Sequence, residues 1–457
     1  PGSYYLTGNL SVTSGDAIAI NASGVTLDLG GFTISSRAAG TGGSGITTAS
    51  STSRITIRHG FIAGGVTSAT AGFSGAGLRH GLYATGSENV VVEDVTVQGL
   101  VGDGINLLGG SGVIRSCAAR LCGGVGLRAN QVLDSQARQC GATAIFAGTA
   151  PDDSQGNPVA DGVATNCYGE SVAGSPGVFA TTATNCIGKS DSGAGVSAKT
   201  ATNCQGQSLT GPGVSSTTAA GCTGTSSGST GLTASTATDC YGYSYYGWGL
   251  FAEEATGCHG KSEQGTRGLH AANTATGCTG EIVSATGPDD GWNCGLHAGN
   301  AINCQGIIGA VTSRGTTIGI EATNVSNSHG SAPGAGIRCT NAHNSTGTGK
   351  IYGMKAEGTA ENCRGTADGD WGIGLLAETA TGCIGQNSSY IGLSAATATN
   401  CTGITSSGDI ALFVTGVATN CRGKNPKAGG KAISAIIAVS CTSDGGTIDA
   451  IHKYNMP

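Results

Sequence analysis

The chain has 457 residues, of which 83 are glycine, and only 11% of its residues are charged. A hydrophobic content of 38% is too high for a disordered chain, and the absence of a Gly-X-Y period excludes collagen. With 5% aromatic residues, large side chains are too scarce for an ordinary globular core of this size, which favours a stack of thin layers. The net charge of −6, without any basic block, argues against nucleic acid as a partner. The sequence contains no apolar run of about 18 residues, so we expect no membrane insertion.

The first 115 or so residues contain alternating apolar and polar residues, which predict successive β-strands. The stretches that show this are "AIAINASGVTLDLGGFTI" (17–34), "SRITIRHGFIAGG" (53–65) and "ENVVVEDVTVQG" (88–99). The opening "PGSYYLTGNL" is typical of a mature or trimmed start.

From about residue 116 onwards the chain repeats itself, as "GVFATTATNCIGKS" (177–190) and "GVSAKTATNCQGQS" (195–208) illustrate. An apolar residue after glycine, here termed the anchor, is followed eight or nine positions later by a cysteine. The pairs are Val178 and Cys186, Val196 and Cys204, Val214 and Cys222, Leu232 and Cys240, Leu250 and Cys258, Leu269 and Cys278, Leu296 and Cys304, Met354 and Cys363, Leu375 and Cys383, Leu393 and Cys401, Leu412 and Cys421, and Ile433 and Cys441. Ser328 and Ser345 occupy the cysteine position in two intervening repeats. Such a period predicts a solenoid.

The residue before each cysteine is Asn, Gly or Asp in nearly every repeat, and these residues tolerate positive φ. We therefore expect a tight corner before each cysteine and one coil of a parallel β-helix per repeat. The whole chain, 1–457, is predicted to be one all-β domain of about 20 coils, with larger, irregular coils over 1–115 and a cysteine ladder over 116–457. The cysteines are expected to stack inside as reduced thiols, although a disulfide between neighbouring coils would also fit the spacing. Cys122, Cys294 and Cys339 lie outside this pattern.

The N-terminal strands together with the repeats resemble the right-handed parallel β-helix (pectin-lyase-like) superfamily, in particular secreted bacterial right-handed β-helix repeat proteins. This resemblance implies a right-handed β-helix that is secreted or located at the cell surface. It does not specify one activity, because the superfamily includes lyases, hydrolases, epimerases, adhesins and tailspikes.

The repeats lengthen between Leu269 and Leu375, and their outward-facing residues change there. The extra residues fall in loops such as "SATGPDDGWN" (284–293), which contains Asp290, and "GTADGDWG" (365–372). The residue after each anchor should point outward. In these coils it is ionisable five times in succession, at His270, His297, Glu321, Arg338 and Lys355. Two positions further on lie Glu253, Glu357 and Glu378.

The aromatic residues of the chain concentrate near these coils. All three tryptophans, Trp248, Trp292 and Trp371, precede an anchor by two or four residues, and Tyr245, Tyr246 and Phe251 lie close to Trp248. Flat aromatic rings beside a polar groove suit sugar rings. The column from His270 to Lys355 spans about 19 Å at strand spacing, which suits an extended polymer. We therefore expect a polysaccharide-binding face, with an acidic polymer favoured.

Cleavage is a further hypothesis. The adjacent Arg338 and Lys355 resemble the Lys/Arg arrangement of β-helix lyases that act on uronic-acid polymers, such as alginate lyases and chondroitinase B. That resemblance implies Lys355 as the base and Arg338 as the acid or carboxylate partner, and His270 or His297 is an alternative base. Glu321 and Glu357 flank the pair and would be the ligands of a Ca²⁺ ion, if one binds.

Four alternatives remain open at this stage. The first is a glycoside hydrolase, in which Glu321 and Glu357 would be the two catalytic carboxylates. The stretches "PDDG" (288–291) and "SHG" (328–330) are similar to polygalacturonase motifs, although the Asn-Thr-Asp-Gly element of that family is missing. A structural or adhesive surface protein needs no catalyst. Assembly into homo-oligomers or end to end is compatible with the same fold. Finally, repeated Thr-x-Thr, as at Thr182 and Thr184, resembles β-helical ice-binding proteins.

Overall fold

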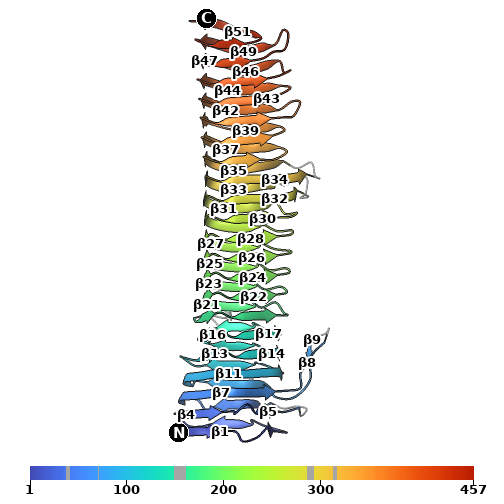
Figure 1. Cartoon of the computed structure of the whole chain (residues 1–457), viewed down its shortest axis with the longest axis vertical. Coiled ribbons are helices and arrows are strands. Elements are labelled where there is room, and N and C mark those ends of the chain that lie inside the picture. The colour runs from blue at the N-terminus through green and yellow to red at the C-terminus, as the bar shows by residue number, and fades with distance from the viewer. Residues whose placement is uncertain (38–41, 70–71, 149–160, 286–292, 312–315, 457) are drawn as a thin grey trace. The chain divides into compact units, whose positions relative to one another are not determined.

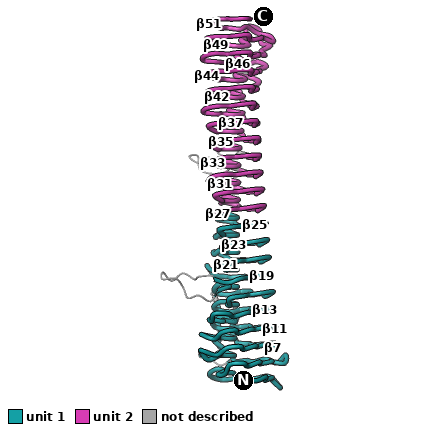
Figure 2. Tube along the Cα trace, turned by 90° about the vertical axis from the view of Figure 1, so that its left-hand side faces the viewer, with its two compact units in different colours: residues 1–234 teal, residues 235–457 magenta. Residues whose placement is uncertain are grey.

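The computed structural model describes residues 1–37, 42–69, 72–148, 161–285, 293–311 and 316–456. These residues form 51 β-strands and contain no helix. The chain divides into two compact units, unit 1 (Pro1–Ala234) and unit 2 (Ser235–Pro457), which Figure 2 colours separately. The boundary falls inside strand β27 (Leu232–Thr238).

Each unit is a parallel β-solenoid, and the described residues make about 21 turns in all (Figure 1). A full coil has three strand positions, which we name A, B and C in chain order. In the coil from 178 to 190, position A is the anchor segment (178–180), position B is the Thr-x-Thr segment (182–184), and position C follows the corner (187–190). Each position pairs in parallel with the same position of the next coil. The prediction of an all-β parallel β-helix is confirmed.

In unit 1, positions A and B are separate strands in most early coils and merge later. Position A is formed by β3 (Ile18–Ile20), β6 (Ser44–Thr48), β10 (His80–Thr85), β12 (Ile105–Leu108), β15 (Leu127–Ala129) and β18 (Ile145–Ala147). Position B is formed by β1 (Gly2–Tyr5), β4 (Val25–Asp28), β13 (Val113–Arg115), β16 (Gln131–Leu133) and β19 (Val163–Thr165). Strands that contain both A and B are β21 (Val178–Thr184), β23 (Val196–Thr202) and β25 (Val214–Ala220).

Position C of unit 1 follows the corner of each coil. Its strands are β2 (Leu10–Ser11), β5 (Thr33–Ser35), β14 (Ala118–Cys122), β17 (Gln136–Cys140), β20 (Tyr168–Ser171), β22 (Ile187–Ser190), β24 (Gln205–Ser208) and β26 (Thr223–Ser226). Two long strands, β7 (Ser53–Ala63) and β11 (Glu88–Leu100), run through positions B and C. A short antiparallel hairpin is formed by β8 (Thr67–Ala69) and β9 (Gly72–Ser74).

In unit 2 most A and B segments are continuous. The strands that cover A and B are β29 (Leu250–Thr256), β31 (Arg267–Thr276), β33 (Asn293–Ile302), β35 (Thr317–Ser326), β37 (Ala335–His343), β39 (Tyr352–Ala356) with β40 (Thr359–Glu361), β42 (Ile373–Thr381), β44 (Ile391–Thr399), β46 (Ile410–Val414) with β47 (Val417–Thr419), β49 (Lys431–Val439) and β51 (Thr447–Tyr454). Position C is formed by β28 (Tyr241–Ser244), β30 (His259–Ser262), β32 (Thr279–Ala285), β34 (Gln305–Val311), β36 (His329–Ser331), β38 (Thr346–Gly349), β41 (Arg364–Ala367), β43 (Ile384–Asn387), β45 (Thr402–Thr405), β48 (Arg422–Lys424) and β50 (Thr442–Asp444).

The predicted corners are confirmed. The residue before each ladder cysteine has positive φ, for example 52° at Asn185, 50° at Asp239 and 56° at Asn400, or 59° where glycine takes its place at Gly221. Asparagine, aspartate and glycine accept this left-handed conformation at low cost, which explains why they recur there.

The cysteines line the core immediately after these corners. All 18 are buried and none is in a disulfide, which agrees with the prediction of reduced structural thiols. The thiol of Cys186 donates to the carbonyl oxygens of Thr184 (3.3 Å) and of Ala164 in the preceding coil (3.4 Å). Ser328 makes the same two contacts in its coil. Burial raises the pKa of Cys117 to about 12, so this thiol stays protonated.

Not every cysteine belongs to that ladder. Cys122 lies in register with Cys140, and the two form a short second stack at the end of position C. Cys294 and Cys339 are buried on the inner side of position A, and Cys294 clusters with Ile318 and Ala335. These cysteines therefore also act as small apolar core residues.

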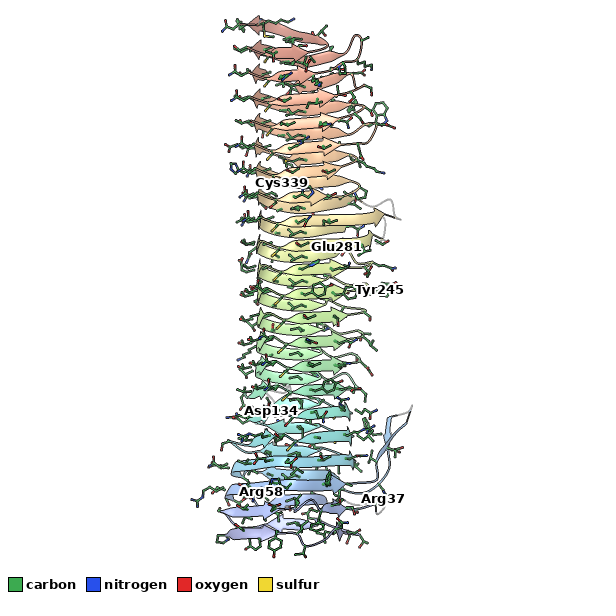
Figure 3. The ribbon with its side chains drawn as sticks, in the orientation of Figure 1. Arg37, Arg58, Asp134, Tyr245, Glu281 and Cys339 are labelled. Carbon is green, nitrogen blue, oxygen red and sulfur yellow. The ribbon has the colours of Figure 1, made fainter. Side chains whose placement is uncertain are left out.

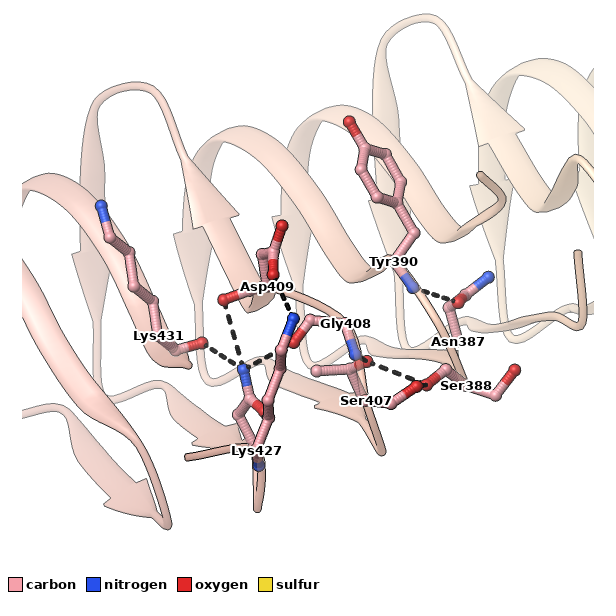
Figure 4. A network of polar contacts seen from close by, with 10 residues as sticks. Asn387, Ser388, Tyr390, Ser407, Gly408, Asp409, Lys427 and Lys431 are labelled. Carbon is pink, nitrogen blue, oxygen red and sulfur yellow. Dashed lines mark hydrogen bonds and ion pairs between the residues drawn. The ribbon is translucent and has the colours of Figure 1, made fainter. Parts of the chain in front are cut away.

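The end of position C is tied to the loop that follows it by a buried polar side chain. In the uniform coils this residue is serine: Ser190 accepts from the Gly193 amide (2.9 Å) and donates to the Ser175 carbonyl (2.8 Å). Later coils of unit 2 use asparagine, as Asn387 does when it accepts from the Tyr390 amide at 2.7 Å (Figure 4). Because these loops are held at a defined position, the residues that follow them at the start of position A are also held.

Candidate functional site

The predicted column of outward residues exists in unit 2 and lies in register from coil to coil. Phe251 pairs with His270 and His270 with His297. His297 pairs with Glu321, Glu321 with Arg338, and Arg338 with Lys355. The strands β29 to β39 therefore hold six side chains in one line, with neighbours about 4.8 Å apart at the backbone. We name this set, Phe251 to Lys355, the outward column.

An open groove of about 400 Å³ runs beside this column, and His297, Glu321, Arg338 and Glu357 line it. The groove follows from residue size two positions beyond the column. There Ala272, Gly299, Thr323 and Thr340 leave space, whereas the coils on either side carry Glu253 and Glu357 at that position.

Aromatic and basic side chains pack together at one end of the column. The Trp248 ring lies 5.1 Å from the His270 ring and 5.5 Å from the Phe251 ring, centroid to centroid. The Arg267 guanidinium lies 5.0 Å from the centre of the Trp248 ring and 2.7 Å from Nδ1 of His270. An arginine can only donate, so Nδ1 of His270 is the acceptor in this contact and carries no proton.

Both histidines of the column are neutral at pH 7. Burial, followed by the charge of Arg267 and then by His297, lowers the pKa of His270 to about 4. Burial and the charge of Arg267 also lower the pKa of His297. The two rings meet edge to face with centroids 4.7 Å apart, and Nδ1 of His297 is buried without a hydrogen-bond partner in the described residues.

The other end of the column is an ionic cluster. Glu357 lies 3.8 Å from the guanidinium of Arg338 and 3.6 Å from the ammonium of Lys355. Glu321 lies between His297 and Arg338 in the column, and burial raises its pKa although Arg338 and Arg267 oppose the shift. The cluster thus combines two cations, one exposed carboxylate and one carboxylate that protonates more readily than usual.

The remaining predicted binding residues are spread along the loop edge. Tyr245 and Tyr246 contact each other with ring centroids 4.6 Å apart, and Tyr245 lies at the loop edge of its coil (Figure 3). Trp371 is 81% exposed and packs against Tyr390, five coils further along the chain than His270. Glu378 is exposed beyond Lys355. Trp292 and Asp290 lie outside the described residues, so their predicted role is not tested.

The residues do not fit a Ca²⁺ site. Of the two predicted ligands, Glu357 already contacts Arg338 and Lys355, and Glu321 lies beside Arg338. Ca²⁺ requires six to eight oxygen ligands. In the described ranges no group of three or more His, Cys, Asp or Glu side chains is placed to hold a metal ion.

The polygalacturonase-like "SHG" motif and the Thr-x-Thr segments lie at different places in the coils. Ser328 of "SHG" is a buried ladder residue that bonds to backbone carbonyls, so it belongs to the core. "PDDG" (288–291) lies outside the described residues. The Thr-x-Thr segments point outward at position B, with alanine buried between them, but the rows are interrupted at Ala220, Glu254 and Ile302.

Sequence reasoning missed Arg267, which contacts both Trp248 and His270. A signal was available, because Arg267 and Trp248 both stand two residues before their anchors, Leu269 and Leu250. Residues at the same offset in successive coils become neighbours in a solenoid.

Comparison with protein-family models, with curated proteins and with solved structures found no match for this chain. In the residues that the structure describes, there is no helix long and apolar enough to cross a membrane.

Proposed function

We propose that this protein is an extracellular or cell-surface β-helix protein of the pectin-lyase-like type that binds an acidic polysaccharide along the outward column. The observation that supports this most is the register of six large aromatic or ionisable side chains in successive coils, three of which, His297, Glu321 and Arg338, line one groove. The same position carries a small side chain in two of the uniform coils, at Ser197 and Ser215, whereas single large apolar residues stand there at Phe179, Leu376 and Phe413.

The chemistry along the column suits a chain of acidic sugars. Trp248 and Phe251 offer flat apolar surfaces against which sugar rings stack. Arg338 and Lys355, at the other end, offer cations to carboxylates, and guanidinium forks match a carboxylate in two hydrogen bonds. Six consecutive coils span about 24 Å, which corresponds to several linked sugars rather than to one small molecule.

Binding of polymers tests the proposal. We expect polygalacturonate or alginate to bind in isothermal titration calorimetry at low salt, and neutral dextran not to bind. Arg338→Ala should weaken binding by about tenfold or more, since a charge-assisted contact is worth roughly 1.5–3 kcal/mol. Arg364→Ala is the matched control, because Arg364 is a cation of the same unit at position C, on another face. Equal binding of acidic and neutral polymers, or equal losses in both variants, would overturn the proposal.

Cleavage of the polymer by β-elimination is a second candidate, which a specific observation favours. A neutral histidine, His297, lies one coil from Glu321, whose pKa is raised, and two coils from Arg338. In this reaction a base removes the C5 proton, the C4–O bond breaks, a C4=C5 double bond forms, and an acid protonates the leaving oxygen. Arg338 would hold the carboxylate and Glu321 would supply the proton. His297 is favoured over Lys355 as base, because Lys355 contacts Glu357 as a cation.

The unsaturated product absorbs near 235 nm, so cleavage is measured directly. If elimination occurs with His297 as the base, His297→Ala abolishes the rise in absorbance while polymer binding persists. Loss of the rise in Lys355→Ala but not in His297→Ala would return the role of base to Lys355. No rise with any uronic-acid polymer would eliminate the cleavage candidate and leave binding.

A further inference from the structure

A second polar groove lies in unit 1, on position C of the coils that contain β11, β14 and β17. Its volume is about 470 Å³, and Gln98, Arg120, Arg138, Gln139 and Glu170 are among the residues that line it. Volumes of this order accommodate ligands the size of a sugar or a nucleotide fragment. No residue of this groove belongs to the outward column.

Two arginines stand side by side in this groove. Arg120 and Arg138 are register partners on adjacent strands, and Gln98 is the partner of Arg120 on the other side. The register follows from the repeated "AARLC" (118–122) and "QARQC" (136–140), in which alanine and cysteine point inward and arginine points outward. Their backbones lie one strand spacing, about 4.8 Å, apart, so two like charges extend from neighbouring positions and repel each other.

Both guanidiniums are held in place by neighbours that do not neutralise them. The Arg138 guanidinium lies 4.4 Å from the centre of the Tyr168 ring. Nε of Arg120 donates to Oε1 of Gln139 at 3.3 Å. In the described part of the chain neither forms an ion pair with a carboxylate; the nearby Glu170 instead accepts from the Tyr168 hydroxyl at 3.2 Å.

This arrangement differs from that of two other arginines in unit 1, Arg58 and Arg115. Arg58 pairs with Asp28 at 3.0 Å, and Arg115 pairs with Glu93 at 3.9 Å. A pair of fixed, adjacent cations with unused donors is the arrangement that binds oxyanions, because each planar fork donates two parallel hydrogen bonds. A tetrahedral anion offers enough oxygens for both forks at once, whereas a carboxylate offers two.

We propose that Arg120 and Arg138 form a binding site for a phosphate or sulfate group, either free or carried by a sugar. The amides of Gln98 and Gln136, which also face the groove, add donors beside the two guanidiniums. This inference does not rest on the proposed function, because it uses other residues in another unit.

The test is calorimetric titration of the full chain with inorganic phosphate and, separately, with glucose 6-phosphate at low salt. We expect binding of at least one, and Arg120→Gln to weaken it by about tenfold or more. Arg115→Gln is the matched control, since Arg115 is already paired with Glu93 and should leave binding unchanged. Tighter binding of glucose 6-phosphate would identify a sugar ester as the ligand, and equal binding would identify the free anion.

A further variant separates charge from geometry. Arg138→Lys keeps the positive charge but loses the planar fork and its stacking on Tyr168, so binding should fall to a value between those of the wild type and Arg138→Gln. Unchanged melting temperatures would show that the variants fold. Absence of binding by both probes, or equal affinity in wild type and Arg120→Gln, would overturn the proposal.

Discussion

The uniform coils around β21, β23 and β25 and the longer coils from β31 to β39 follow the same repeat but differ on their outer surface. Both bury an anchor, an alanine between the outward residues and a small polar or sulfur-containing residue after the corner. After the anchor, the uniform coils carry Phe179, Ser197 and Ser215, none of them ionisable, whereas the longer coils carry His297, Glu321 and Arg338. The inside of a coil is therefore constrained by the stack, whereas its outer surface varies and is available for binding.

The largest expected effect concerns the inside of a uniform coil. A methyl group on Gly206 would lie 1.9 Å from the carbonyl oxygen of Gly213, so strand C and the start of strand A pack backbone against backbone there. Gly206→Ala should therefore lower the free energy of unfolding by about 3 kcal/mol. Urea denaturation followed by circular dichroism measures this.

Gly174→Ala is the control for that change. A methyl group on Gly174 meets nothing closer than the Ser192 hydroxyl at 3.5 Å. The midpoint of urea denaturation should therefore hardly change in this variant. Similar losses in both variants would show that the close approach at Gly206 is not what constrains the coil.

The next effect concerns the ionic end of the outward column. Glu357→Gln removes the carboxylate that competes with a ligand for Arg338 and Lys355, so acidic polymer should bind about two- to fivefold more tightly at low salt. Glu378→Gln removes an equivalent exposed charge one coil further on, without those two contacts, and should change the affinity less. Weaker binding in Glu357→Gln would mean that the carboxylate itself contacts the polymer. Calorimetry distinguishes these outcomes.

The histidines of the outward column should make the stability of the folded chain depend on pH, whereas the serines at the same position of the uniform coils should not. The pKa of His270 is about 4 in the folded chain against 6.5 when unperturbed. Between these values the unfolded chain binds a proton that the folded chain excludes, so stability falls as pH drops from 6.5 towards 4 and levels off below. His270→Gln should lose less stability than the wild type between pH 7.5 and pH 5 in thermal melts. An equal loss would contradict the pKa shift.

The smallest effect is expected in the ladder. Cys186→Ser should lower the free energy of unfolding by no more than about 1 kcal/mol, because Ser328 makes equivalent hydrogen bonds at the same position of its coil. In the folded protein the 18 buried thiols should not react with a thiol reagent, and all should react after denaturation. Rapid reaction of several thiols in the native state would show that the ladder is open to solvent.

Most of the fold could be predicted from the sequence repeat alone. The sequence predicted the buried anchor Val178, the corner at Asn185 and the buried Cys186. Each of these features depends only on the residue itself and on the equivalent residue in the neighbouring coil. Alignment of the anchors also placed His270 to Lys355 in one column. Contacts across different offsets were not predictable in this way: Glu357 turns back to Arg338, and Arg267 reaches His270, through side-chain conformations that no period specifies.

Hydrogen–deuterium exchange with and without an acidic polymer, such as polygalacturonate, tests the difference between the two kinds of coil most directly. We predict slower exchange on binding in β33, β35 and β37, and no change in β21, β23 and β25. Protection of the uniform coils, or no protection of β33 to β37 at a polymer concentration that calorimetry shows to be saturating, would contradict the assignment of the groove as the binding site.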